Sequence, residues 1–309
     1  MDVNSDSKVS ILIPTRNRTD LFKSSLESIL NQTYKNIEII ISDNYPDSID
    51  TEEYIKNIKD KRIIYIKQKE LIPMEDHWNF LIKQATGEYI CIYHDDDIYS
   101  KDIVETSLKY FLEKDNVLMC HVLTKHFSND INQGSKVKIL HTKDYISNIE
   151  YLQYCIKNKP SIVCSSVMYP RWVFNKYKFK NEYKSFDYHL WFELLQNKGY
   201  IAYNTDSLMY YRKHANNTFK KFDIFNVQKE YCEMFEKCLS DENRKLLSYP
   251  TNYIQNYIIE NLISQELGIK RMLNPYYTIR FYKKLISYKF EVSITHFFKV
   301  LFQRFKKRC

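Results

Sequence analysis

Short apolar runs alternate with amphipathic segments along the first third of the chain, and this alternation constrains the fold more than any other feature. The predicted strands are residues 9–14, 37–42, 62–67 and 88–93, and the predicted helices between them are residues 19–34 and 76–85. Strands that are separated by helices usually pair in parallel, with helices on both faces of the sheet. We therefore predict an α/β fold around a mixed, mostly parallel sheet.

Beyond residue 97 the pattern becomes mixed, and helices predominate after about residue 225. The predicted elements are a helix at 101–113, a strand at 117–124, a loop or hairpin at 129–138, a helix at 187–198, and strands at 200–204 and 208–212. Pro250 and Pro275 interrupt the later helices. We therefore place a domain boundary near residue 225, followed by a helical C-terminal region.

Three of the predicted strands lead into short segments that contain polar and charged residues. These are Pro14, Thr15, Arg16, Asn17 and Arg18 after the first strand, Asp43 and Asn44 after the second, and His94, Asp95, Asp96 and Asp97 after the fourth. In open parallel sheets, ligands bind at the carboxyl ends of the strands. We therefore expect the three loops to line one site.

Asp95, Asp96 and Asp97 form a run of three carboxylates, with no Lys or Arg before Lys101. Two carboxylates about 4 Å apart repel each other by roughly 4 kcal/mol at an effective dielectric constant of 20. A fold that gathers three of them needs a cation to offset the repulsion, and a divalent metal ion is the first candidate. A solvated acidic loop is the alternative.

Composition excludes several classes of protein. Four glycines are too few for the glycine-rich loop of a dinucleotide-binding or P-loop protein, so side chains must hold any nucleotide. Gly87 and Gly199 are predicted to cap the C-termini of helices. The seven cysteines are scattered and form no C-x-x-C pair, which argues against a disulfide framework or a zinc site. No apolar run reaches 18 residues and the N-terminus is polar, so we expect a cytoplasmic protein.

Five sequence blocks, in order, resemble the family 2 inverting glycosyltransferases, whose catalytic domain has the GT-A fold. The blocks are VSILIPTRNR, SILNQTYKNIEIIISDN, NFLIKQATGEYICIYHDDD, SFDYHLWFELLQNKGYIAY and YYRKHANNT. The resemblance implies a GT-A catalytic domain at 1–225, with a nucleotide-binding half at about 8–100 and an acceptor half at about 101–225. The helical C-terminal region would then occupy residues 226–309.

The resemblance also implies which residues bind the nucleotide. In the family, the Asp that closes the second strand pairs with the uracil ring, which makes Asp43 the base-reading residue here; a turn-capping Asp is the alternative. The other expected nucleotide-binding residues are Pro14, Thr15, Arg16, Asn17, Asp95 and Arg212. The expected donor is therefore a UDP-sugar.

The acidic motif of the family has the form Asp-x-Asp, and the alignment places His94 at its first position. Asp95 then occupies the variable position, Asp96 the position of the metal-binding carboxylate, and Asp97 follows. A register shifted by one residue would instead pair Asp95 with Asp97. The expected metal ligands are Asp96, Asp97 and His214, and Mn²⁺ or Mg²⁺ is the expected cofactor, because both ions accept hard oxygen ligands.

Asp187 matches the general base of the family, which takes a proton from the acceptor hydroxyl group as that group attacks the anomeric carbon. Phe186 replaces the Glu that precedes this Asp in the family. A helix N-cap is the alternative role for Asp187. A single base implies direct displacement with inversion, through a transition state like that of glycoside hydrolysis.

Residues 276–309 contain nine Lys or Arg residues and one Glu, interleaved with phenylalanines. This composition is typical of a basic amphipathic helix at a membrane surface, and a helix packed on the catalytic domain is the alternative. We expect a glycan or lipid-linked oligosaccharide acceptor, contact with the inner face of an anionic membrane, and no nucleic acid. The rival functions are a non-catalytic, membrane-associated protein that binds sugar nucleotides or carbohydrates, and a sugar-nucleotide pyrophosphorylase.

Overall fold

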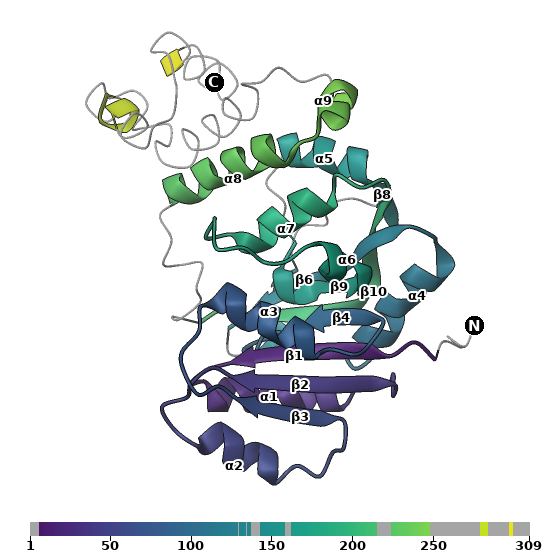
Figure 1. Cartoon of the computed structure of the whole chain (residues 1–309), viewed down its shortest axis with the longest axis vertical. Helices are drawn as coiled ribbons and strands as arrows, with labels where there is room; N and C mark the ends of the chain where they lie inside the picture. The colour runs from purple at the N-terminus through teal and green to yellow at the C-terminus, as the bar shows by residue number, and fades with distance from the viewer. Residues whose placement is uncertain are drawn as a thin grey trace.

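The computed structural model of the chain describes residues 6–128, 130–133, 135–136, 143–157, 162–214, 224–247, 279–283 and 297–298. These residues form a ten-stranded sheet of order β3-β2-β1-β4-β9-β6-β10-β5, with β7 paired to β6 and β8 paired to β10 (Figure 1). The strands are β1 (Val9–Thr15), β2 (Ile37–Asp43), β3 (Ile63–Lys67), β4 (Tyr89–Ile92), β5 (Ile98–Tyr99), β6 (Val117–Phe127), β7 (Ser135–Lys136), β8 (Tyr145–Ser147), β9 (Val167–Pro170) and β10 (Tyr200–Arg212). The helices are α1 (Thr19–Leu30), α2 (Asp50–Lys56), α3 (Met74–Gln84), α4 (Ile103–Glu113), α5 (Asn148–Lys157), α6 (Trp172–Lys176), α7 (Phe186–Leu194), α8 (Ile224–Cys238) and α9 (Asp241–Leu247).

The long strand pairings are parallel, as the sequence predicts. Strand β1 pairs in parallel with both β2 and β4, β3 continues the sheet beyond β2, and β10 pairs in parallel with β6. Strand β9 runs antiparallel between β4 and β6, so those two strands point the same way. The carboxyl ends of β1, β2, β4, β6 and β10 therefore meet at one rim of the sheet.

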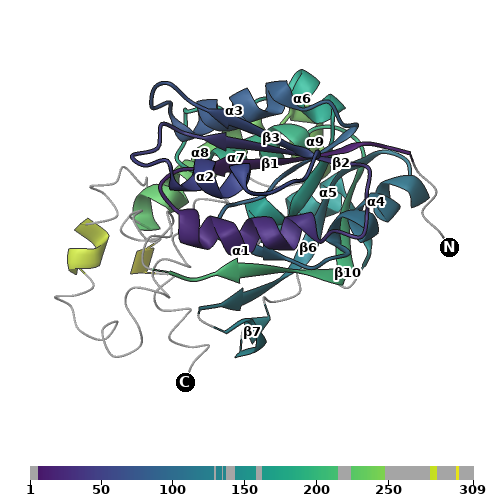
Figure 2. The ribbon, with the colours of Figure 1, turned by 90° about the horizontal axis from the view of Figure 1, so that it is seen from below.

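Alternating strand residues bury two apolar layers, one on each face of the sheet. Leu12 of β1 packs in the layer covered by α3, α5, α6, α7 and α8, whereas Ile11 and Ile13 pack in the layer covered by α1, α2 and α4. Figure 2 shows α1 and α3 on opposite sides of the strands. Each buried isoleucine or leucine contributes about 1.5–3 kcal/mol. Because both faces of the sheet are packed, the strand ends that carry the polar loops are held in fixed positions.

Strand β10 corrects the prediction of two separate strands at 200–204 and 208–212. The chain remains in one strand across these residues, with a shift of register against β6 between Asn204 and Leu208. The Asn204 side chain accepts hydrogen bonds from the backbone N–H groups of Asp206 and Ser207, at 2.9 and 3.3 Å. These bonds satisfy the irregular backbone, so the strand continues beyond it.

The predicted role of two glycines is also wrong. Helix α3 ends with Ala85 as its C-cap, and neither Gly87 nor Gly199 adopts the left-handed conformation of a helix-capping glycine. A Cβ atom on Gly87 would lie 2.6 Å from the Lys8 carbonyl oxygen, and one on Gly199 would lie 2.4 Å from the Asn116 carbonyl oxygen. Both positions need glycine because another strand's backbone approaches closely.

Helix α8 begins at Ile224, next to the predicted boundary, and packs against α7. The rings of Tyr231 and Phe235 contact Phe192 at centroid distances of 5.2 and 5.1 Å.

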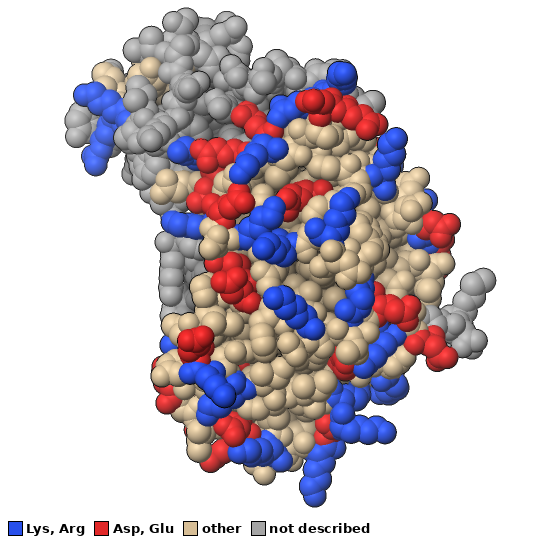
Figure 3. Space-filling model, viewed as in Figure 1, with Lys and Arg blue, Asp and Glu red and all other residues tan. Residues whose placement is uncertain are grey.

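Most of the basic tail at 276–309 lies outside the described residues. On the face in Figure 3, basic and acidic side chains are interspersed. Among the helices that the structure describes, none is both long and apolar enough to span a bilayer.

Candidate active site

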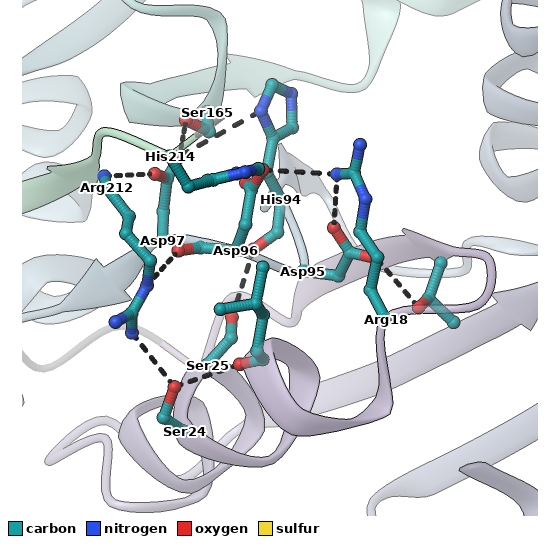
Figure 4. A network of polar contacts seen from close by, with 12 residues as sticks. Arg18, Ser24, Ser25, His94, Asp95, Asp96, Asp97, Ser165, Arg212 and His214 are labelled. Atoms are coloured by element: carbon teal, nitrogen blue, oxygen red, sulfur yellow. Dashed lines mark hydrogen bonds and ion pairs between the residues drawn. The ribbon is translucent and has the colours of Figure 1, made fainter. Parts of the chain in front are cut away.

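The acidic run lies at the carboxyl end of β4, between the loop after β1 and the end of β10. Figure 4 shows Arg18 on one side of the three carboxylates and Arg212 on the other. The three side chains point to different partners, because the chain turns at Asp95 and Asp96 between β4 and β5. The sequence prediction that three loops share one rim is therefore correct for the loops after β1 and β4.

Asp95 faces the first loop. Its Oδ2 atom accepts a hydrogen bond from the Thr15 hydroxyl at 2.8 Å, and its Oδ1 atom lies 3.2 Å from an Arg18 guanidinium nitrogen. The carboxylate is thus held by the last residue of β1 and by a residue of the loop that follows it. Burial raises the pKa of Asp95 to about 6, against the lowering effect of Arg18.

Asp96 occupies the centre of the cluster. Its Oδ2 atom lies 3.1 Å from the Arg18 guanidinium and 2.9 Å from Nε2 of His214, which follows β10 by two residues. The Arg212 side chain donates from Nε to the Asp96 backbone carbonyl at 2.9 Å. A carboxylate, an imidazole and a guanidinium thus meet at one oxygen atom.

Asp97 is the most buried of the three carboxylates, with a side chain that is fully inaccessible. Ser165 donates to its Oδ2 atom at 2.6 Å, and the Arg212 backbone N–H donates to its Oδ1 atom at 3.0 Å. Burial and the charge of Asp96 raise the pKa of Asp97 well above its usual value. Asp97 therefore connects β4 to β10 and to the segment before β9.

Three side chains of this rim are close enough to share a metal ion. One ligand atom each from His94, Asp96 and Asp97 lies within 4.8 Å of the other two, and no further group of three acidic, histidine or cysteine ligands occurs among the described residues. His214 adds a fourth candidate ligand beside Asp96. Carboxylate and imidazole donors suit Mn²⁺ and similar divalent ions. The residues present therefore fit the expected metal, and Asp95 lies outside the group.

His94 is held firmly although it departs from the family motif. Its backbone carbonyl accepts from the Ser25 hydroxyl at 3.0 Å, and its backbone N–H donates to the Tyr99 hydroxyl at 2.8 Å. Its ring packs against Trp78, with 5.3 Å between the centroids. Burial lowers the pKa of His94. Phe186, the second departure from the family pattern, packs against the same Trp78 at 4.9 Å.

Asp43 forms a second polar position at the end of β2, with different surroundings. Its side chain is fully buried, its Oδ2 atom accepts from the Tyr65 hydroxyl at 3.2 Å, and its Oδ1 atom has no hydrogen-bond partner among the described residues. Burial raises the pKa of Asp43 to about 6, while Tyr65 and Lys67 lower it. An unpaired buried acceptor costs about 1–3 kcal/mol, which a donor from a ligand can offset.

The remaining residues of the first loop lie farther out. Pro14 belongs to β1, and Asn17 adopts a left-handed backbone conformation with φ of 53°. The Asn17 side chain accepts from the Asp47 backbone N–H at 2.8 Å, and the exposed Arg16 lies 3.9 Å from the Asp47 carboxylate. Asn17 therefore ties the loop after β1 to the loop after β2.

Asp187 lies in the first turn of α7 and is half-buried. Its Oδ1 atom accepts from the Tyr188 backbone N–H at 2.9 Å. Its charge adds to burial in raising the pKa of the Cys164 thiol and the Tyr169 hydroxyl. Cys164 precedes Ser165, the partner of Asp97, so Asp187 lies near the segment that borders the acidic cluster.

Several residues of the site escaped the sequence analysis. Arg18 was expected at the rim without a specified partner, and it contacts two carboxylates. Tyr65 and Trp78 were predicted only as members of a strand and a helix. The alternation of side chains along β3 could have indicated which face of the sheet Tyr65 shares. Ser165 has no place in the sequence prediction, although its hydroxyl group donates to Asp97.

Known proteins resemble this chain in sequence and in fold. Residues 10–178 match the family described as glycosyl transferase family 2. The chain is 34% identical over 221 residues to the UDP-Glc:α-D-GlcNAc-diphosphoundecaprenol β-1,3-glucosyltransferase WfaP of Escherichia coli, covering 68% of this chain and 78% of that protein. Other relatives are longer: the chain spans 26% of a Rickettsia felis glycosyltransferase, to which it is 33% identical over 162 residues, or 51% of this chain.

Solved structures show the same fold at low sequence identity. The Staphylococcus aureus TarS fragment in complex with UDP-GlcNAc superposes with a TM-score of 0.62 at 13% identity, over 87% of this chain and 76% of that chain. The mannosyltransferase PcManGT of Pyrobaculum calidifontis, in complex with GDP-Man and Mn²⁺, gives 0.60 at 13% identity, over 92% and 85%. The predicted GT-A fold is thereby confirmed.

Proposed function

Because the chain belongs to glycosyl transferase family 2, we propose that it transfers a sugar from a UDP-sugar to a hydroxyl group of a lipid-linked glycan, with inversion at the anomeric carbon. The observation that carries the proposal is the shared rim of the sheet. It presents a buried acceptor at Asp43 and a cluster of metal-binding side chains around Asp96.

The surroundings of Asp43 support a sugar nucleotide whose base is uracil. Its unpaired Oδ1 atom is a hydrogen-bond acceptor without a competing protein donor among the described residues, and the uracil ring offers a single N–H group of the right kind. Tyr65 holds the other oxygen, which fixes the carboxylate plane. A guanine base would present a larger ring with more donors than one buried oxygen atom can accept.

The acidic cluster supports binding of the diphosphate. Asp96 and His214 would hold a divalent ion, with Asp97 and His94 beside them. When bound, such an ion supplies positive charge that stabilises the departing nucleoside diphosphate. Arg18 and Arg212 lie at the two sides of the cluster and add cationic groups that can approach phosphate oxygens.

Asp187 would act as the general base for the acceptor hydroxyl group. Its position in the first turn of α7 favours the ionised form, because the positive end of the helix dipole stabilises a carboxylate. Its charge is felt by the buried hydroxyl groups of Tyr169 and Tyr188, so the carboxylate lies near an aromatic part of the core. In this proposal the base comes from the acceptor half of the chain, and it would activate the hydroxyl group that attacks the anomeric carbon on the side away from the leaving diphosphate.

The acceptor proposal rests on the relatives. The name of the Escherichia coli relative specifies UDP-glucose as donor and a GlcNAc-diphosphoundecaprenol as acceptor. We extend the acceptor class, a sugar linked through diphosphate to a polyprenyl lipid, to this chain. A lipid-linked acceptor would place the protein at the inner face of a membrane as a peripheral enzyme of surface-polysaccharide synthesis. The division at residue 225 would then separate the catalytic domain from a membrane-facing helical region.

The test is a donor screen with a synthetic GlcNAc-diphospho-lipid acceptor and Mn²⁺. Nucleotide release is measured with UDP-, GDP- and dTDP-sugars, and the anomeric configuration of the product is determined by NMR. We expect turnover with a UDP-sugar only and an inverted product. A GDP- or dTDP-sugar as the sole donor, or a product with retained configuration, would contradict the proposal.

The base is tested by Asp187→Asn, with Asp20→Asn as the matched control. Both substitutions remove an acidic residue from the first turn of a helix, but Asp20 is fully exposed on α1. Asp187→Asn should lower kcat by about 10²–10⁴-fold and leave UDP affinity unchanged, because only proton transfer is lost. Equal kcat values for the two variants would exclude Asp187 as the base.

A further inference from the structure

His94 and Phe186 are the two departures from the family pattern, and one side chain contacts both of them. The Trp78 ring lies 5.3 Å from the His94 ring and 4.9 Å from the Phe186 ring. Trp78 also packs against Phe179 at 5.2 Å, so it is held in an aromatic cluster. The two departures therefore belong to one local arrangement, in which an apolar wall supports an imidazole where the family has a carboxylate.

The imidazole of His94 faces the metal-binding side chains. Its Nδ1 atom lies 3.9 Å from Asp97 Oδ2, which is longer than a hydrogen bond. Two ligands of one Mn²⁺ or Mg²⁺ ion, each bound at about 2.1 Å, lie no more than about 4.2 Å apart. The distances within the group of His94, Asp96 and Asp97 reach at most 4.8 Å, so a small adjustment brings all three to a common ion.

The His94 ring lies beside Asp97 and Trp78, and its nitrogen atoms are not committed to a hydrogen bond with Asp97. Its Nε2 atom is buried and makes no hydrogen bond to any residue that the structure describes. Nδ1 is the ring nitrogen beside the carboxylates, so Nδ1 is the atom that would bind the ion and Nε2 would carry the proton. The backbone of His94 is nevertheless fixed on both sides, by Ser25 and by Tyr99. A fixed backbone with an uncommitted imidazole is the arrangement of a ligand.

We propose, building on the proposed metal-dependent transfer, that His94 is a metal ligand beside Asp96 and His214, and that its nitrogen makes the site select Mn²⁺ over Mg²⁺. His214 already lies 2.9 Å from Asp96 on the other side of the cluster. Two imidazoles and a carboxylate form a mixed nitrogen and oxygen donor set. Transition-metal ions accept such sets, whereas Mg²⁺ favours oxygen ligands and retains its water.

The direct test counts nitrogen ligands. Mn²⁺ is bound to the full chain in the presence of UDP, and the coupling of its unpaired electrons to ¹⁴N is measured by pulsed electron paramagnetic resonance. The wild type should show two imidazole nitrogens. His94→Asn and His214→Asn should each show one, and the double variant none. His126→Asn is the matched control, because His126 lies on β6 against Tyr211 and outside the group of candidate ligands.

The second test measures selectivity through affinity rather than activity. Calorimetric titration with each metal in the presence of UDP should show Mn²⁺ affinity lowered at least about tenfold in His94→Asn, as even the loss of a supporting contact lowers metal affinity by about 10–100-fold. His94→Asp, which restores the carboxylate of the family motif, should bind Mg²⁺ more tightly than the wild type does. A ratio of Mn²⁺ to Mg²⁺ affinity that is the same in all three proteins would contradict the proposal.

The outcomes separate this inference from the function on which it rests. If His94→Asn binds UDP and Mn²⁺ with an unchanged ¹⁴N signal, His94 is not a ligand, while metal-dependent transfer stands. If the wild type binds UDP with the same affinity with and without Mn²⁺, the metal role itself is wrong and the inference falls with it. Thermal unfolding of each variant establishes that a lost signal does not come from a lost fold.

Discussion

Asp43 and Asp96 lie at the same rim of one parallel sheet, yet their surroundings differ in almost every respect. Asp43 is buried beside a tyrosine hydroxyl and keeps one oxygen atom without a partner among the described residues. Asp96 is surrounded by a guanidinium, an imidazole and two further carboxylates. The strand ends fix only where a carboxylate lies. Its neighbours decide whether it can accept a neutral N–H group or hold a cation.

The largest expected effect is the loss of transfer activity on substitution of Asp96, the carboxylate that is proposed to bind the metal ion. Asp96→Asn should lower transfer by at least about 100-fold, because metal stabilisation of a departing diphosphate contributes several kcal/mol. Uridine, which has no phosphate, should bind this variant as tightly as the wild type. Calorimetry with uridine and a transfer assay provide the two measurements. Weak uridine binding by Asp96→Asn would show that the two positions are not independent.

Asp43→Asn should produce the reverse pattern at a smaller magnitude. Loss of a charged acceptor for the base N–H costs about 1.5–3 kcal/mol, so KM for the UDP-sugar should rise about 10–150-fold. The dependence on Mn²⁺ concentration should stay as in the wild type. Steady-state kinetics at several Mn²⁺ concentrations check this. A Mn²⁺ requirement that changes with this substitution would break the comparison.

The pH dependence of uridine binding sharpens the comparison further. The Asp43 pKa is raised to about 6, with Tyr65, Lys67, Glu52 and Arg16 as the groups that influence it. The carboxylate is ionised above that pH, so affinity should be constant at pH 7–8 and fall as the pH drops through about 6. Uridine is used because Asp95 also has a pKa of about 6 and would affect diphosphate binding.

Tyr65→Phe tests the cause of this pH profile. The Tyr65 hydroxyl donates to Asp43 and lowers its pKa, so its removal should raise the pKa and move the acid limb of uridine affinity to higher pH. Tyr89→Phe is the control, since Tyr89 begins β4 and so lies at the amino end of that strand, away from the rim. A profile that is the same in both variants would show that the Tyr65 hydroxyl group does not lower the pKa of Asp43.

The smallest expected effect is a difference in the free energy of unfolding between substitutions of two arginines in the first loop. Arg18 contacts both Asp95 and Asp96, whereas Arg16 lies 3.9 Å from an exposed carboxylate. Arg18→Gln should lower the free energy of unfolding by about 1 kcal/mol, since its contacts are charge-assisted but its side chain is partly exposed. Arg16→Gln should stay within about 0.5 kcal/mol of the wild type. Urea unfolding measures both. Equal losses would show that the Arg18 contacts contribute nothing specific.

Much of this architecture follows from local sequence pattern. The four apolar runs predicted the first four strands and hence the rim, because strands joined by helices pair in parallel. The polar residues at the strand ends then had to lie on one side. The full length of β10 was not predictable, because Asn204 is held at the irregularity by the hydroxyl groups of Thr106 and Ser107, which are distant in sequence.

The partners of the site residues were harder to predict than the residues themselves. Ser165 contacts Asp97 across 68 positions of sequence, and His214 contacts Asp96 across 118. The local periodicity of the sequence cannot predict contacts between residues so far apart in the chain, since these contacts depend on the order of strands in the sheet. The family resemblance suggested His214 but not Ser165 or Trp78. The role of His94 required its neighbours to be known.

The central claim is that one rim binds the two ends of a single nucleotide by different means. Calorimetric titration of the wild type with UDP and with uridine, each with and without Mn²⁺, tests it most directly. The account predicts that Mn²⁺ strengthens UDP binding at least about tenfold and leaves uridine binding unchanged. UDP binding that does not respond to Mn²⁺, or uridine binding that responds equally, would contradict it.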